Sequence, residues 1–235
     1  MIDPPLYPHV VVGYESHDRG EDAKFLGELI VRAAGGELAV LNVDDADPAE
    51  VLRRMAERGE ADLIVLGSTH RTAIGSVAPG SVAENLLRGA RSRLLIAPKG
   101  YSKWDHSDDR LRVIAVGYDA TAESSAALAD AAELTRRAHA SMRVIAVASP
   151  ATPVEVLQAQ LHDAAAGLPS ELRALPVLER GDPDEKLLGA AKLGVDLLVL
   201  GSRGHGPMKR LVLGSVSSRV IRESPAPVMI VPRPR

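Results

Sequence analysis

The residues best suited to bind a ligand lie in a glycine-rich segment near the C-terminus. Gly201, Gly204 and Gly214 follow a short apolar run with the spacing G-x2-G-x9-G, and Ser215 comes directly after the third glycine. Glycine tolerates positive φ and lets backbone amides approach a ligand closely. A helix that begins at Ser215 would add unpaired amides and a partial positive charge, which suit a phosphate group. The segment matches neither a P-loop nor the Rossmann fingerprint, and glycine in a loop can also serve a turn alone.

A second candidate is Asp119, which follows the apolar run 113–116. Open α/β sheets bind ligands at the carboxyl ends of their strands, where the strand order reverses. At such a place a carboxylate can accept a hydrogen bond from a ribose or an adenine while the glycine segment holds phosphates. The alternative interpretation is that Asp119, or Thr121, caps the helix that follows.

The elements that would position these residues occur twice along the chain. Residues 9–16 resemble 112–121, residues 61–70 resemble 195–204, and residues 79–87 resemble 213–221, in the same order. Both copies also end alike, at 92–100 and 226–234. We therefore predict two modules, 1–100 and 111–235, joined by a polar linker at 101–110. For Trp104 we expect a structural role, in which its side chain anchors this linker to a module.

Apolar runs alternate with helical patterns in the second module. Predicted strands cover 113–116, 143–147, 174–178, 197–200 and 228–231, and predicted helices cover 122–140, 153–168, 184–193 and 215–223. This alternation indicates an α/β fold with a parallel sheet covered on both faces. In the first module the interval from Glu15 to Asp47 is about half of the interval from Asp119 to Asp182. One helix and one strand are therefore missing there, and the strand 38–43 is the equivalent of either the second or the third strand.

Three patterns together resemble the ATP-binding branch of the universal stress protein family: Gly117-Tyr118-Asp119 after a strand, the glycine-rich segment, and the apolar ending 226–232. The chain is identified as a tandem member of that family. The resemblance implies two doubly wound parallel-sheet modules with the strand order 3-2-1-4-5, the first of them shortened. It also implies that ATP, or a close adenine nucleotide, lies between the first and fourth strands of the second module, while Mg is not evident from the sequence. The nucleotide contacts that it implies are Gly117, Asp119, Val147, Gly201, Ser202, Arg203, Gly204, His205, Gly214, Ser215, Val216 and Ser217.

The first module departs from this pattern. His70 stands where the second glycine of the loop should be, and Glu15 replaces the aspartate. We therefore expect a degenerate first site and one nucleotide per chain. The alternative is a modified site in which His70 and Arg71 supply charged phosphate contacts.

The favoured function is a stress-response protein that binds ATP in its C-terminal module for signalling or regulation. The alternatives are a structural or interaction module with vestigial sites, and a slow ATP-hydrolysing enzyme. No catalytic residue is predicted, because no nucleophile is paired with a base and the first strand of the second module is not followed by a His-x-x-His pattern. The histidines show no metal spacing, so no metal ligand is predicted either.

Composition limits the partners. The net charge of −3 gives no electrostatic case for nucleic acid, and the chain has no cysteine. No apolar run is long enough to span a membrane, and the N-terminus shows no signal-peptide pattern, so we expect a cytoplasmic protein.

The short apolar strands 94–97 and 228–231 would each lie at a sheet edge, which is normally covered. We predict that they pair antiparallel within one chain; a homodimer is compatible with the sequence, which gives no argument for it.

Overall fold

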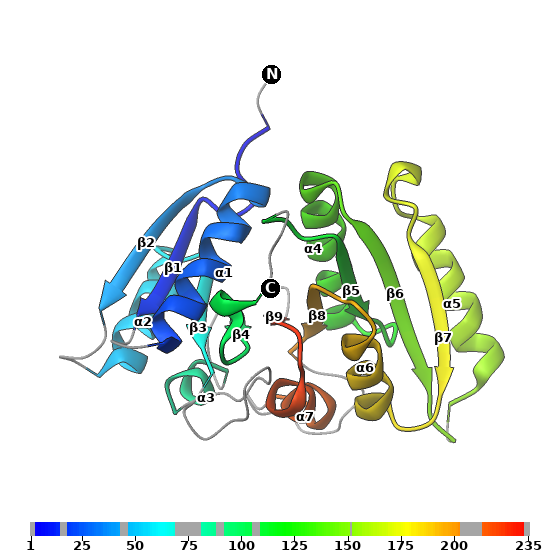
Figure 1. Cartoon of the computed structure of the whole chain (residues 1–235). Coiled ribbons are helices and arrows are strands. Elements are labelled where there is room, and N and C mark those ends of the chain that lie inside the picture. The colour runs from blue at the N-terminus through cyan, green and yellow to red at the C-terminus, as the bar shows by residue number, and fades with distance from the viewer. Residues whose placement is uncertain are drawn as a thin grey trace.

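One continuous sheet runs through the computed structural model, which describes residues 3–14, 18–42, 47–68, 81–87, 92–104, 109–150, 152–202 and 213–232. Within these residues the sheet has nine strands in the order β2-β1-β3-β4-β9-β8-β5-β6-β7. The first four belong to the N-terminal module and the other five to the C-terminal module (Figure 1). No helix in the described part of the chain is both long and apolar enough to cross a membrane.

The second module has the predicted strand order. Its elements are β5 (Val113–Gly117), α4 (Ala122–Ala138), β6 (Ser141–Ala148), α5 (Val154–Ala166), β7 (Leu175–Arg180), α6 (Pro183–Lys192), β8 (Leu197–Gly201), α7 (Ser215–Glu223) and β9 (Val228–Val231). The strands lie as β7-β6-β5-β8-β9, and all four neighbouring pairs are parallel. In order along the module this is 3-2-1-4-5, which confirms the doubly wound fold.

The first module is a shortened copy. Its elements are β1 (His9–Tyr14), α1 (Asp18–Ala34), β2 (Glu37–Asn42), α2 (Pro48–Arg58), β3 (Leu63–Gly67), α3 (Ser81–Leu87) and β4 (Arg93–Ala97). Strand β2 pairs directly with β1, in the register His9↔Glu37, and β6 pairs with β5 in the matching register Val113↔Ser141. Strand β2 is therefore the second strand, and the missing pieces are the counterparts of α5 and β7.

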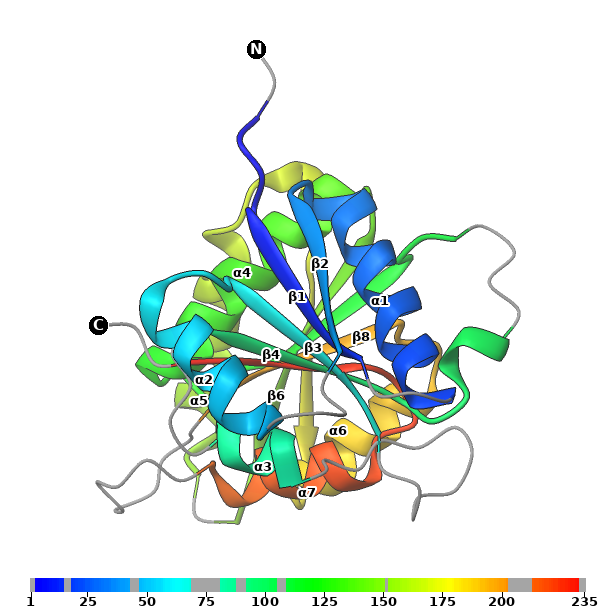
Figure 2. The ribbon, with the colours of Figure 1, turned by 90° about the vertical axis from the view of Figure 1, so that its left-hand side faces the viewer.

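The modules join through their last strands. Strand β4 pairs antiparallel with β9, with Leu94 opposite Ile230 and Ile96 opposite Val228. The predicted pairing of the two closing strands is thus confirmed. Each face of the shared sheet carries one hydrophobic core that spans both modules: α1, α4 and α5 cover one face, and α2, α3, α6 and α7 cover the other (Figures 1 and 2).

A buried polar cluster crosses the join between the modules. Asp130 on α4 accepts two hydrogen bonds from the Arg93 guanidinium of β4, at 2.6 and 2.7 Å, and a third from the Tyr7 hydroxyl at 3.1 Å. The Arg93 guanidinium also lies 5.2 Å from the centre of the Tyr7 ring. Burial, followed by the negative charge of Asp130, raises the pKa of Tyr7 well above its usual value. Polar side chains from both modules thus supply one another's hydrogen bonds inside the core.

The connection between the modules is tied to α1. The buried carboxylate of Asp22 accepts hydrogen bonds from the Gly100 amide at 2.7 Å and from the Ser102 amide and hydroxyl at 2.9 and 2.7 Å. The Trp104 ring meets the buried Tyr101 ring edge-on, with 4.9 Å between centroids. Trp104 thus packs against another residue of the linker, and the Tyr101 ring in turn meets the Phe25 ring of α1 edge-on, with 5.9 Å between centroids.

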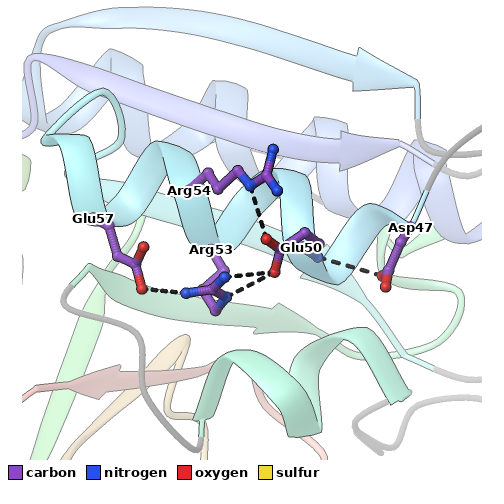
Figure 3. A network of polar contacts seen from close by, with 5 residues as sticks. All are labelled: Asp47, Glu50, Arg53, Arg54 and Glu57. Carbon is purple, nitrogen blue, oxygen red and sulfur yellow. Dashed lines mark hydrogen bonds and ion pairs between the residues drawn. The ribbon is translucent and has the colours of Figure 1, made fainter.

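Helix α2 begins at an Asp-Pro pair, Asp47 and Pro48. Asp47 caps it by accepting from the Glu50 amide at 3.3 Å, and Pro48 occupies the first turn, where a missing amide hydrogen costs nothing. Glu50 in turn pairs with both Arg53 and Arg54, as Figure 3 shows. Their hydrogen bonds lower the pKa of Glu50. This network lies on the surface of the helix.

Candidate functional site

The point at which the strand order reverses in the second module lies between β5 and β8. These strands are parallel neighbours, with Val116 opposite Val199. The helix after β5 packs on one face of the sheet, and the helix after β8 packs on the other. The carboxyl ends of β5 and β8 are Gly117 and Gly201. This is the position at which open α/β sheets bind ligands.

Packing within the protein leaves little room for a side chain at either strand-ending glycine, and backbone atoms are the obstacle only at Gly201. A Cβ atom at Gly117 would lie 2.7 Å from Cδ2 of Leu200. One at Gly201 would lie 2.8 Å from the backbone carbon of Glu123, in the first turn of α4. The close approach of β8 to α4 therefore explains Gly201 without a ligand. These two positions carry less information about binding than their place in the motif suggests.

Asp119 organises the turn that follows β5. Its Oδ1 accepts hydrogen bonds from the Thr121 hydroxyl at 2.5 Å and the Thr121 amide at 3.2 Å. Thr121 is the N-cap of α4, because its Oγ1 accepts from the Ser124 amide at 3.2 Å. Of the two cap candidates the structure thus selects Thr121, with Asp119 holding it. Ala120 between them has a φ of 59°, which marks the turn as tight.

Hydrogen bonds close the base of the glycine-rich loop. The Gly214 amide donates to the Ser202 carbonyl at 3.0 Å, and the Ser202 amide donates to the Val231 carbonyl at 2.9 Å. The buried hydroxyl of Ser217, in the first turn of α7, donates to the Gly201 carbonyl at 3.0 Å. These contacts fix the start of α7 beside the end of β8.

Among the helices of the second module, α7 has the N-terminus best suited to bind an anion. Its N-cap, Gly214, supplies no side-chain hydrogen bond, and its first turn contains no acidic residue. The first turns of α4, α5 and α6 do contain acidic residues, which is the usual complement to a helix dipole. Helix α7 therefore keeps its partial positive charge unneutralised by its own first turn, and Ser215 there is exposed.

The remaining residues of the predicted site are placed only in part. Val147 is partly buried on β6, two positions beyond Ile145, which pairs with Gly117. Val216 is half-buried in the first turn of α7. Arg203, Gly204 and His205 lie outside the described residues, as do Glu15, His70 and Arg71 of the first module.

The matching helix of the first module differs at two positions that sequence analysis missed. Ala83 of α3 stands where Ser217 stands in α7, so no hydroxyl is available for the bond to the strand end. The next residue, Glu84, places a carboxylate in the first turn of α3. Aligning the two copies residue by residue beyond the Gly-Ser pair would have revealed both. The Glu84 carboxylate opposes the partial positive charge at the start of α3, which α7 keeps.

The chain belongs to the universal stress protein family. The family model, described as the universal stress protein family, matches residues 2–98 and again 110–232, so the tandem organisation is shown together with the family. A universal stress protein of Mycobacterium tuberculosis is 29% identical over 76% of this chain and 66% of its own length. One from Mycolicibacterium smegmatis is 32% identical over 74% of this chain and 63% of its own length. The chain thus spans slightly less than two thirds of the length of these two relatives.

Solved structures agree on the fold. A universal stress protein from Archaeoglobus fulgidus superimposes with a TM-score of 0.65 at 22% identity, covering 96% of this chain and 88% of its own. A protein described as a universal stress protein from Pseudomonas aeruginosa superimposes with a TM-score of 0.68 at 16% identity, covering 96% of this chain and 93% of its own. Both matches extend across the two modules.

Proposed function

We propose that this universal stress protein binds one ATP, or a close adenine nucleotide, per chain at the carboxyl ends of β5 and β8, and that the bound nucleotide serves a regulatory role in a stress response. The observation that carries the proposal is the N-terminus of α7. It is held beside the strand-order reversal by Ser217 and has no acidic residue in its first turn. A triphosphate would lie against its amides, and Gly204 and the other loop residues would close around it.

Asp119 supplies the contact that selects the nucleoside. It lies two residues beyond the end of β5, and its Oδ1 is held in place by two hydrogen bonds from Thr121. A carboxylate fixed in this way is an acceptor for a ribose hydroxyl or an adenine amino group. Val147 would contact the adenine from β6. The site therefore has a polar end at α7 and an apolar end at β6.

The stoichiometry of one nucleotide per chain follows from α3. Glu84 in its first turn repels a phosphate, and Ala83 lacks the hydroxyl that ties α7 to its strand. The sequence supports the same stoichiometry, because Glu15 and His70 depart from the nucleotide-binding pattern in the first module.

Titration calorimetry with ATP tests the proposal. Wild-type protein should bind one ATP per chain, and Asp119→Ala or Gly204→Val should remove that binding. The matched control is Glu15→Ala, the corresponding position of the first module, which should leave the affinity unchanged. Melting temperatures without ligand show whether each variant is folded, and a ligand that binds only the folded protein should raise that temperature in the wild type. Absence of binding at millimolar ATP, or two ATP molecules per chain, would contradict the proposal.

A further inference from the structure

Strand β2 forms one edge of the nine-stranded sheet and has an exposed apolar residue at its centre. Val40 is 49% exposed, whereas its counterpart in the second module, Val144, is fully buried. The two residues are equivalent because Val40 pairs with Val12 and Val144 pairs with Val116 in matching registers. Val144 is covered by α5, whose Leu157 and Leu161 join the same core. The missing helix thus explains why Val40 is exposed.

The two edges of the sheet are protected very differently. Edge strands normally carry prolines, charged side chains or bulges that prevent further pairing. Strand β7, at the far edge, contains Pro176, Glu179 and Arg180, and Glu179 forms an ion pair with Lys186 at 3.1 Å. Strand β2 has the sequence Glu-Leu-Ala-Val-Leu-Asn, with no proline and no basic residue. It pairs with β1 over six consecutive residues without a bulge. Only one of the two edges is thus closed to another strand.

The sequence of β2 fits a second copy of itself. In an antiparallel pair about a two-fold axis at Val40, the two Val40 side chains lie opposite each other on the same face. Ala39 then lies opposite Leu41, and Leu38 opposite Asn42. The single charge of the strand, Glu37, lies at its beginning, so the two copies place their carboxylates at opposite ends of the pair. Within the six paired residues no like charges are opposed, and the exposed aliphatic residue is covered by its own equivalent.

We propose that two copies of this chain associate through their β2 edges, antiparallel and centred on Val40, to form a dimer with one sheet running through both. A pair of six-residue strands is a small contact compared with a permanent protein interface. The dimer is therefore concentration-dependent, and the monomer retains its own fold.

Sedimentation velocity on a dilution series of the full chain tests this association. One chain has a mass of 24.9 kDa, and the wild-type mass should approach twice that value as concentration rises. Val40→Lys adds the kind of charge that protects natural edges and should hold the protein at the mass of one chain. The matched control is Leu175→Lys, at a 56% exposed position on the other edge strand, which should dimerise like the wild type.

Disulfide trapping tests the register. The chain has no cysteine, so Val40→Cys introduces a single thiol, and two such thiols would face each other across the axis. Mild oxidation should give a covalent dimer from Val40→Cys and none from Leu175→Cys. If Val40→Lys failed to fold, hydrogen exchange of the wild type would replace it, because the β2 amides should gain protection at high concentration and the β7 amides should not. A wild type that stays monomeric, a dimer that Val40→Lys leaves intact, or a Val40→Cys variant that does not cross-link would each overturn the proposal.

Discussion

Replacing Asp130 by alanine should strongly destabilise both modules together. The change removes two charge-assisted hydrogen bonds from Arg93, each of which contributes about 1.5–3 kcal/mol in proteins. Among the described residues, it also leaves the fully buried Tyr7 hydroxyl with only one partner, the Met229 sulfur at 3.8 Å. Arg93 is 31% exposed and can recover part of its hydration. We therefore expect a loss of about 3 kcal/mol, at the lower end of the range for a broken buried ion pair.

Urea denaturation of Asp130→Ala, Arg93→Ala and the double variant measures the effect and its origin. The coupling energy of this cycle should reach about 1–3 kcal/mol if the two side chains stabilise the join through each other. Because Arg93 belongs to the first module and Asp130 to the second, unfolding of the wild type should be one transition for both. Glu50→Ala, in the surface network of α2 (Figure 3), is the control and should have little effect. A loss below about 1 kcal/mol for Asp130→Ala, or a coupling energy near zero, would refute the reasoning.

Three further predictions concern other contacts. The hydrogen bonds of Arg136, then of Arg137, lower the pKa of Glu133 from 4.5 to about 2, against the opposing effect of burial. The stability that this lowering provides is complete above pH 4.5 and lost as the pH falls toward 2, so Glu133→Gln should flatten the acid limb of a stability–pH curve. Asp22→Ala should release the linker from α1 and increase the quenching of the fluorescence of Trp104, the only tryptophan; unchanged quenching would contradict the anchoring. Gly201→Ala should cost about 1–3 kcal/mol in a denaturation curve, because its Cβ would meet the Glu123 backbone, whereas a neutral result would show that α4 can move.

Much of the fold could be predicted from local patterns. Buried parallel strands appear in the sequence as short apolar runs, and the order of the repeated segments revealed both modules. The pairing of β4 with β9 was predicted because each would otherwise be an exposed apolar edge. The predicted strand at 143–147 was too short, because Ser141 and Met142 also pair with β5. Only the register of β2 against β1 could show which strand the first module retains. A pattern of strands does not contain that information.

The candidate site was less predictable, since its important contacts join residues far apart in the sequence. The glycine motif suggested that Gly201 serves a ligand, but the contact that excludes a side chain there comes from α4. Ser217 was predicted to meet a phosphate, which stays a prediction, and the structure adds that its hydroxyl donates to the Gly201 carbonyl. A motif can indicate where a site lies, but packing across the sheet decides what each of its residues does.

Because β4 and β9 pair antiparallel, the linker between the modules is not what holds them together. The modules are held together by the pairing of β4 with β9, by two hydrophobic cores that each contain residues of both modules, and by the Arg93–Asp130 ion pair. The peptide that links them mainly raises the effective concentration of one half near the other. A cut in the linker would therefore leave two fragments that stay together as a non-covalent complex. The two halves, made as separate chains, would be natural candidates for reassembly into one sheet, a split protein whose fragments recognise each other by their last strands.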